Sequence, residues 1–225
     1  MPDTAVALDN PIWFALSGPQ ARFGEIRGHA ARYRPDVSPF TALAGPDGWA
    51  DLAALAGPGT DVFMSGPFLE PPAGWTPLRR LAGVQMVGTG LYGTPDPAAV
   101  ELTVADAEEV LDLVRRTEPG PFRPRTVELG RYLGIRQDGR LVAMAGERLR
   151  VPGFTEISAV CTDPAYRGRG LAERLMRAVA AGIRDRGDTP FLASLASNDT
   201  ALRLYARLGF EARTPVTFAV FRTPG

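Results

Sequence analysis

The chain has 225 residues, 45% of them hydrophobic, and its 25 basic and 25 acidic residues give a formal net charge of zero. This composition is typical of a globular protein with a sizeable core, and zero net charge gives no general electrostatic reason to expect nucleic acid or an anionic membrane as a partner. Every basic residue is an arginine, which excludes a Walker phosphate loop and a lysine base, while one histidine (His29) and one cysteine (Cys161) exclude a His/Cys metal cluster and an internal disulfide.

Residues 1–14 lack the basic and continuous apolar regions of a signal peptide, and no later run of about 18 apolar residues exists, so a cytoplasmic protein is expected.

The first 95 residues are expected to form a small α/β unit. Proline and glycine recur throughout these residues and keep their elements short. Between these breaks the pattern predicts one helix and two strands, at residues 48–55, 61–64 and 81–87.

The glycine- and proline-rich stretch 92–97 is the natural linker, and it divides the chain into predicted domains 1–95 and 96–225. The second domain has a regular series of predicted elements: strand 100–104, a helix capped by Asp106, a short helical stretch 126–133, a hairpin of 133–136 and 141–149, strand 154–162, helix 171–186, strand 190–195, a helix capped by Asn198, and final strands 211–213 and 216–222. A hairpin followed by a strand–helix–strand crossover implies antiparallel and parallel neighbours in one sheet. The expected fold class is therefore α/β, with an α+β type of mixed sheet.

A glycine-rich turn, Tyr166-Arg167-Gly168-Arg169-Gly170-Leu171-Ala172, joins a predicted strand to a predicted helix. Such a turn leaves free backbone N–H groups pointing at one spot, where the helix dipole favours negative charge. The segment therefore predicts a phosphate-binding site, although a glycine pair before a helix is often only a tight turn. A dinucleotide-binding fingerprint is not complete, because Glu173 stands where that fingerprint has its third glycine.

The strand before this turn, residues 154–162, contains two residues of chemical interest. Alternation predicts that Ile157, Ala159 and Cys161 share one face and that Glu156 lies on the other, on the side of the glycine turn. Cys161 is expected to be a small buried residue, because this half of the chain has no histidine or lysine to activate it.

Several features follow one another in the chain: the strand, Arg167-x-x-Gly170-x-Ala172, the long helix, the next strand, Asn198, Tyr205 and Gly209-Phe210. Together they resemble the acyl-CoA-binding half of the GNAT superfamily of N-acetyltransferases, over about residues 99–222. The resemblance implies acetyl-CoA as cosubstrate, with its pyrophosphate on the glycine turn and its pantetheine arm along the preceding strand. It also implies transfer of an acetyl group to a primary amine by direct attack, without a metal. The residues that it assigns to CoA are Val160, Cys161, Thr162, Arg167, Gly168, Arg169, Gly170, Leu171, Ala172 and Asn198.

The resemblance implies one catalytic residue, and the composition indicates another. Tyr205, in a position that is otherwise typical of a core edge, would protonate the departing thiolate. The acceptor amine must also lose a proton, and without histidine or lysine in this half Glu156 is the first candidate base and Glu147 the second. The alternative is a CoA-binding module without catalysis, in which Tyr205 and Glu156 are structural. The acceptor, a small-molecule or peptide amine, is not identified by any of these residues.

Two expectations concern regions outside the motifs. The loop 115–125 carries arginines that are expected to select an acceptor with a negative group, or else to line a solvated connector: Arg115, Arg116, Arg123 and Arg125. By position and size alone, domain 1–95 is interpreted as a degenerate GNAT-like half or a small α/β unit, and His29 within it as a surface or capping residue.

Overall fold

The computed structural model of the protein describes residues 4–225. Short elements make up the first part of the chain. In chain order they are η1 (Thr4–Leu8), α1 (Pro11–Leu16), η2 (Ala21–Phe23), β1 (Gly24–Arg27), β2 (Ala30–Tyr33), β3 (Phe40–Leu43), α2 (Trp49–Ala56), β4 (Asp61–Ser65) and β5 (Thr76–Val87). The predicted helix and strands are confirmed as α2, β4 and β5, and β5 begins earlier than predicted because it pairs with a strand from the chain's end as far as Thr76. Residues 1–3, part of the stretch considered as a signal peptide, lie outside the described residues.

The second part follows the predicted order closely. Its elements are β6 (Val100–Leu102), η3 (Val104–Asp106), α3 (Ala107–Thr117), η4 (Thr126–Leu129), β7 (Tyr132–Gln137), β8 (Arg140–Val151), β9 (Phe154–Thr162), η5 (Pro164–Tyr166), α4 (Leu171–Asp185), β10 (Thr189–Leu195), α5 (Asp199–Leu208) and β11 (Glu211–Arg222). The prediction of two final strands was wrong. They form the single strand β11, because a bulge between Ala212 and Thr214 absorbs the irregularity and lets pairing with β5 continue through Pro215.

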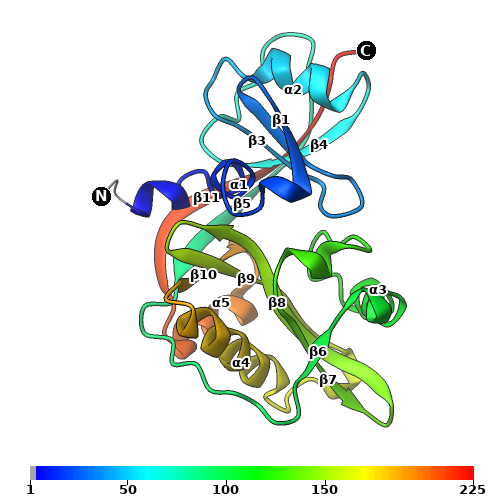
Figure 1. Ribbon diagram of the computed structural model, residues 1–225, viewed down its shortest axis with the longest axis vertical. Coiled ribbons are helices and arrows are strands. Elements are labelled where there is room, and N and C mark those ends of the chain that lie inside the picture. The colour runs from blue at the N-terminus through cyan, green and yellow to red at the C-terminus, as the bar shows by residue number, and fades with distance from the viewer. Residues whose placement is uncertain (1–3) are drawn as a thin grey trace.

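All strands belong to one 11-stranded sheet in the order β1-β2-β3-β4-β11-β5-β10-β9-β8-β7-β6 (Figure 1). The β7–β8 hairpin is antiparallel, whereas β9 and β10 are parallel neighbours joined through α4. The predicted mixed α/β sheet is therefore confirmed.

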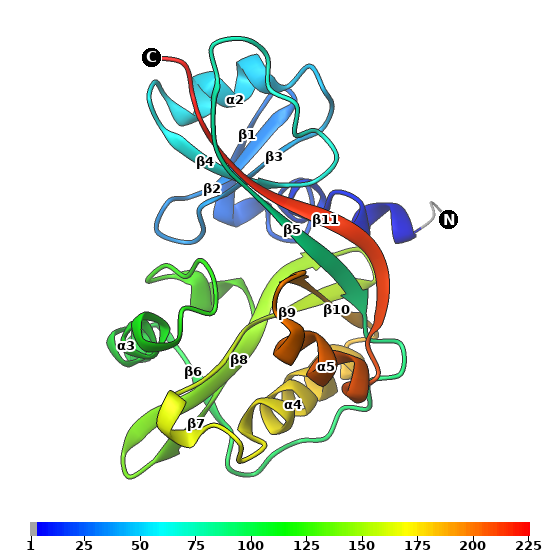
Figure 2. The same ribbon diagram turned by 180° about the vertical axis from the view of Figure 1, so that it is seen from behind.

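Two long strands carry the sheet from one half of the molecule to the other. β5 and β11 have 12 residues each, and they run side by side between the two halves in Figure 2. β5, from the first part of the chain, pairs with β10, while β11, from the chain's end, pairs with β4. The division into domains 1–95 and 96–225 stays a prediction, but three strand pairs of the sheet, β4–β11, β11–β5 and β5–β10, join residues from its two sides.

Helices cover both faces of the sheet. α4 and α5 pack on one face, where Leu175, Met176 and Val179 of α4 are buried in the largest core cluster. The opposite face is covered by α1 at one end and by α3 at the other, where Val110 and Leu113 are fully buried. Among the described residues, no helix is both long enough and apolar enough to cross a membrane.

A bulge in β9 overturns the predicted alternation of its side chains. Ala159 has a positive φ of 54°, and the register with β8 slips between Met144 and Gly146. As a result Ile157 packs in the cluster under α4, while Ala159 and Cys161 pack in the cluster under α3. The prediction that these three residues share a face was wrong, because one extra residue reverses the direction of every side chain beyond it.

Candidate active site

A gap opens between the parallel strands β9 and β10. They pair only from Phe154 to Glu156 on β9, opposite Thr189 to Phe191 on β10. Beyond these residues β9 stays with β8, whereas β10 stays with β5. The facing edges of 157–162 and 192–195 therefore lack a strand partner, and they line a cleft of about 910 Å³.

The glycine turn lies at the mouth of this gap. Gly168 and Gly170 have φ values of 78° and 72°, a region that disfavours side chains, so the turn requires glycine for its backbone shape. A Cβ atom at either position would meet no atom within 4 Å, so the space above the turn is open. Because Gly170 precedes the 15-residue helix α4, the free N–H groups of the helix start at this open space.

Most residues predicted to bind CoA line the cleft. They are Val160, Cys161 and Thr162 of β9, Arg167, Gly168, Gly170, Leu171 and Ala172 around the turn, and Asn198. Arg169 is the exception: its guanidinium lies over the Tyr166 ring, 4.9 Å from the centroid. The Asn198 side chain caps α5 as predicted, since its Oδ1 accepts a hydrogen bond from the Ala201 amide at 3.2 Å.

One fully buried polar atom in the cleft wall, Thr162 Oγ1, has no hydrogen-bond partner among the described residues. The Tyr205 side chain lines the same cleft. Tyr205 packs edge-on against Phe210 at 6.0 Å, and burial raises its pKa to about 12. Its hydroxyl therefore keeps its proton throughout the neutral range. Burial also raises the pKa of Cys161 to about 11, so this thiol is protonated and unreactive, as expected.

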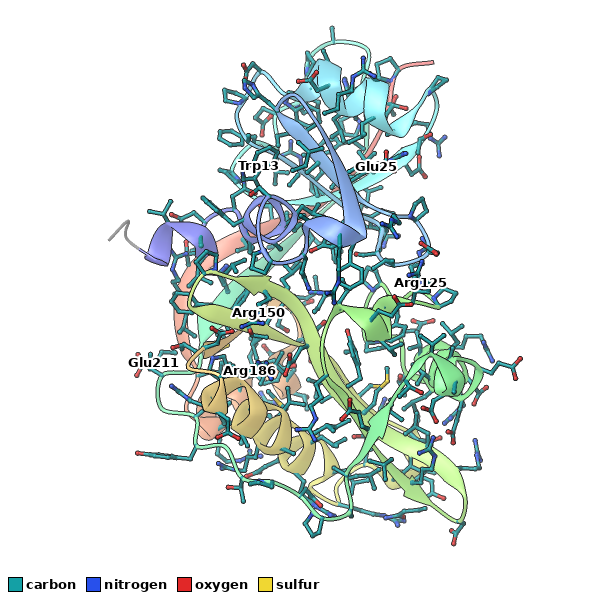
Figure 3. The ribbon with its side chains drawn as sticks, in the orientation of Figure 1. Trp13, Glu25, Arg125, Arg150, Arg186 and Glu211 are labelled. Atoms are coloured by element: carbon teal, nitrogen blue, oxygen red, sulfur yellow. The ribbon has the colours of Figure 1, made fainter. Side chains whose placement is uncertain are left out.

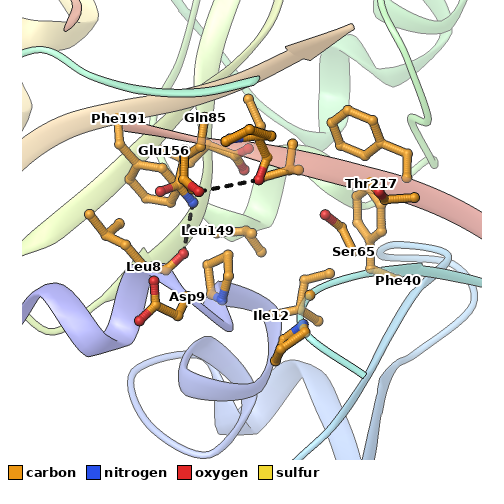
Figure 4. A pocket seen from close by; sticks show the side chains of 18 of the residues that line it. Leu8, Asp9, Ile12, Phe40, Ser65, Gln85, Leu149, Glu156, Phe191 and Thr217 are labelled. Atoms are coloured by element: carbon orange, nitrogen blue, oxygen red, sulfur yellow. Dashed lines mark hydrogen bonds between the residues drawn. The ribbon is translucent and has the colours of Figure 1, made fainter. Parts of the chain in front are cut away.

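Glu156 occupies a different position from the one that simple alternation suggests. Its side chain is 2% exposed, and both carboxylate oxygens accept hydrogen bonds at 2.8 Å from the Arg148 guanidinium. Glu156 lines a second pocket of about 490 Å³, seen in Figure 4, whereas Arg148 lines both this pocket and the cleft. Arg148 is thus part of the wall between them, and its guanidinium also stacks on Phe40 at 4.8 Å.

Glu147, the second candidate base, is also held in an ion pair. Its carboxylate is 2.8 Å from Arg186, which lies at the end of α4 (Figure 3). Glu147 is not among the residues that line the cleft.

The loop 115–125 differs from its prediction. Only its central residues, 117–121, line the cleft. Three of its four arginines are neutralised by carboxylates, and one of them, Arg125, is labelled in Figure 3. The ion pairs are Arg115 with Asp112, Arg116 with Asp112 and Asp163, and Arg125 with Glu128 and Asp36. Arg115, Arg116 and Arg125 are therefore engaged within the fold, because α3, η4, the β2–β3 connection and the residue after β9 supply the acids.

The sequence analysis missed the residues that close the far end of the cleft. They come from the first part of the chain and from β11: Phe40, Phe63, Met64, Arg79, Leu81, Phe218, Ala219 and Val220. No local motif marks them, because pairing of distant strands brings them together. Arg148 had one available signal, because it and its neighbour Glu147 are the two charged residues of an otherwise apolar predicted strand.

The comparisons with known proteins agree with this geometry. The family described as FR47-like protein matches residues 132–219. N-alpha-acetyltransferase RimI of Mycobacterium tuberculosis is 37% identical over 121 residues, which are 49% of this chain and 75% of that protein. The solved structure of a GNAT-family protein from Novosphingobium aromaticivorans is 42% identical and has a TM-score of 0.90, covering 97% of this chain and 99% of that one.

The chain belongs to the GNAT family. It is an N-acetyltransferase, as the sequence predicted, and GNAT acetyltransferases in general use acetyl-CoA. An uncharacterised protein of Mycobacterium leprae is 31% identical over 211 residues, 83% of this chain but 56% of that protein, so the chain spans just over half of that relative's length. In this GNAT chain the described residues include no group of three or more His, Cys, Asp or Glu side chains placed to hold a metal ion.

Proposed function

We propose that this enzyme moves the acetyl group of acetyl-CoA to a primary amine by direct attack. The observation that carries the proposal is that one cleft contains the open strand edges, the glycine turn and the Tyr205 side chain. Acetyl-CoA would supply the acetyl group, activated as a thioester. The residues of the chain then have four tasks, which are to hold the cofactor, to receive the amine, to take its proton and to protonate the leaving thiolate.

The cofactor-binding residues fit an extended molecule with a pyrophosphate. The unpaired edge of β9 offers backbone groups to the amides of a pantetheine arm, and the orphaned Thr162 Oγ1 lies on the same wall. The turn at Gly170 and the start of α4 offer N–H groups to a pyrophosphate. Arg167, which has no ion pair in the described part of the chain, adds a positive charge there.

Tyr205 is the proposed general acid. Burial raises its pKa to about 12, so the hydroxyl is always protonated at neutral pH but is a weak acid. Transfer of its proton to a thiolate whose own pKa is about 8.5 therefore requires a short, direct hydrogen bond in the reacting complex. The lack of a competing hydrogen bond to the hydroxyl among the described residues is consistent with that role.

Glu156 stays the predicted base, but its ion pair with Arg148 restricts how it can take a proton from the amine. Because both of its oxygens are bound to Arg148, the pair must open, or a water must bridge it to the cleft, before it takes a proton. Such a base suits an acceptor that is already largely unprotonated. An α-amino group, with a pKa of about 7.7–8.0, meets this condition better than a lysine side chain at about 10.4.

We therefore propose an α-amine as the acceptor. The name of the RimI relative, an N-alpha-acetyltransferase, supports this choice. A panel of amines tested for thiol release from acetyl-CoA would decide it. Turnover with peptides that have a free N-terminus, and none with the same peptides blocked at the N-terminus, is the expected result. No turnover with any amine would favour the alternative of a CoA-binding module without catalysis.

The glycine turn gives a prediction for cofactor binding. CoA at a hundredfold excess over its Kd is expected to stabilise the native protein by about 2.7 kcal/mol, which raises the melting temperature by about 5–11 °C, and NAD should have no effect. Gly170→Leu should abolish the CoA shift, because its side chain would fill the open space above the turn.

Gly139 provides the matched control for this test. It has a φ of 77°, no atom within 4 Å of a Cβ, and a place in the β7–β8 turn outside the cleft. Gly139→Leu should cost a similar amount of stability through backbone strain and yet keep the full CoA shift. Loss of the CoA-induced rise in melting temperature in both variants, or a rise with NAD, would contradict the proposed phosphate-binding site at the glycine turn.

A second prediction concerns Glu156. Glu156→Gln is expected to lower kcat/KM most at about pH 6, where an α-amine acceptor is largely protonated, and the loss should shrink as the pH approaches about 8. The measurement is a pH–rate profile from about pH 6 to 9, with Glu147→Gln in parallel and melting curves to confirm folding. A profile parallel to the parent at every pH would mean that Glu156 only holds Arg148 in place.

A further inference from the structure

The far end of the cleft has an apolar wall built from three adjacent strands. The register places Leu81 of β5 opposite Phe218 of β11, and Arg79 opposite Val220, which in turn is opposite Phe63 of β4. Directly opposed residues point to the same side of a sheet, and positions two apart on one strand do as well. These five side chains therefore form one surface, called here the acceptor shelf, and all five line the cleft.

The acceptor shelf continues to the gap in which the acetyl group is proposed to lie. Leu195, at the end of β10, pairs with Gly83 and thus points to the same side as Leu81. Leu81 and Leu195 are each 38% exposed, although most large apolar side chains of the chain are buried. Apolar side chains left open inside a concave site are typical of contacts with a ligand.

Arg79 is the polar feature of the acceptor shelf. It is exposed and has no ion pair among the described residues, whereas its neighbour Arg80 binds Glu70 at 3.0 Å on the opposite side of the strand. Arg148, also at this end of the cleft, is fully engaged with Glu156. Arg167 and Arg203, which have no ion pair within residues 4–225, belong to the glycine turn and to α5, which form the CoA end of the cleft.

The position of Arg79 limits the length of the acceptor. Arg79 and Gly83, the partner of Leu195, are four positions apart on β5, which corresponds to about 13 Å at about 3.3 Å per residue. A side chain that leans along the strand covers only part of that span, because strand side chains stand roughly perpendicular to the sheet. An anionic group bound to Arg79 would thus lie several bonds from the reacting amine, too far for the carboxylate of a single α-amino acid.

We infer that the acceptor is a short peptide whose first side chain is apolar and rests on the acceptor shelf, and which carries a carboxylate within its next residues that Arg79 binds. This inference rests on the proposed transfer to an α-amine. It assigns the selection of the acceptor to β4, β5 and β11, of which β4 and β5 come from the first half of the chain, a half that contributes no residue to the proposed CoA site.

Four tripeptide amides test the inference: Phe-Ala-Asp, Phe-Ala-Asn, Gly-Ala-Asp and Gly-Ala-Asn, with the acid also moved to the second and fourth positions of a longer series. The Phe-Ala-Asp amide is expected to have the highest kcat/KM, about fivefold to twentyfold above its Asn counterpart at low salt. Arg79→Gln should bring this Asp-to-Asn ratio close to one. Leu81→Ser should instead reduce the Phe-to-Gly ratio and leave the Asp-to-Asn ratio intact.

Arg140→Gln serves as the control, since Arg140 is exposed on the β7–β8 hairpin, outside the cleft, and has no ion pair in the described part of the chain. It should leave every ratio at the parental value. Raising the salt concentration should shrink the Asp-to-Asn ratio of the parent. Equal rates for Asp and Asn peptides at every position, or a ratio unchanged in Arg79→Gln, would overturn the inference.

Calorimetry with the N-acetylated Phe-Ala-Asp amide separates this inference from the proposed reaction, because it needs no turnover. If no peptide is acetylated but this compound binds the parent at least fivefold more tightly than Arg79→Gln, the acceptor shelf stands and the proposed function fails. If peptides are acetylated but binding is the same in both proteins, the proposed function stands and the acceptor shelf is wrong.

Discussion

Tyr205→Phe is expected to lower kcat by about a hundredfold to ten-thousandfold while acetyl-CoA affinity stays at the parental value. The loss is the usual range for removing one general acid. Affinity should survive because the glycine turn and the β9 edge, which are proposed to bind the cofactor, do not include the Tyr205 hydroxyl. Steady-state kinetics together with calorimetric CoA binding would measure the two quantities separately.

The raised pKa of Tyr205 predicts how the loss of kcat in Tyr205→Phe depends on pH. Because burial raises that pKa to about 12, the acid form persists well above the ordinary tyrosine value of 10.0. The parent should therefore show no fall in kcat from ionisation of Tyr205 up to about pH 10, and the penalty of Tyr205→Phe should be the same from about pH 7 to 10.

Tyr92→Phe is a suitable control, since Tyr92 is 81% exposed and lies outside the cleft. Its kcat should match that of the parent. If Tyr205→Phe retains kcat within about twofold of the parent, a water molecule or the proton of the acceptor amine neutralises the thiolate, and Tyr205 is only a core-edge residue.

The largest stability effect is expected at the Arg148–Glu156 pair. Arg148→Met leaves the Glu156 carboxylate, 2% exposed, without its partner. Breaking a buried pair in this way costs about 3–5 kcal/mol of unfolding free energy, equivalent to a fall of about 6–20 °C in melting temperature for a chain of this size. Loss of the stacking contact between Arg148 and Phe40 adds to the cost.

The double variant Arg148→Met/Glu156→Leu is the critical comparison. Replacing both charges with apolar side chains removes the unpaired carboxylate, so most of the lost stability should return, although activity should not. Denaturant unfolding of the parent, the single variant and the double variant measures the recovery. A double variant no more stable than Arg148→Met would indicate that packing or the adjoining hydrogen bonds, and not the buried charge, cause the loss.

Local sequence patterns were sufficient for much of the fold and for the CoA end of the site. The turn at Gly168 and Gly170 needs backbone angles that glycine adopts readily, and Asn198 caps α5 through an amide three residues away. The β7–β8 hairpin follows from Asp138 and Gly139 at its turn. In each case the residues that form the feature are close neighbours in the chain, so the sequence displays the feature directly.

The acceptor end of the site depended on tertiary structure. A single bulge at Ala159 reversed the faces of β9, which no alternation rule anticipates, and the Arg148 ion pair changed what Glu156 is able to do. The acceptor shelf brings Phe63, Arg79 and Phe218 together only because β11 inserts between β4 and β5. By itself, the sequence determined the local turns, caps and hairpin. The pairing of distant strands decided which charges are neutralised and which side chains face the acceptor. Contacts between distant strands have no signature within one segment of the chain, so only the tertiary structure reveals them.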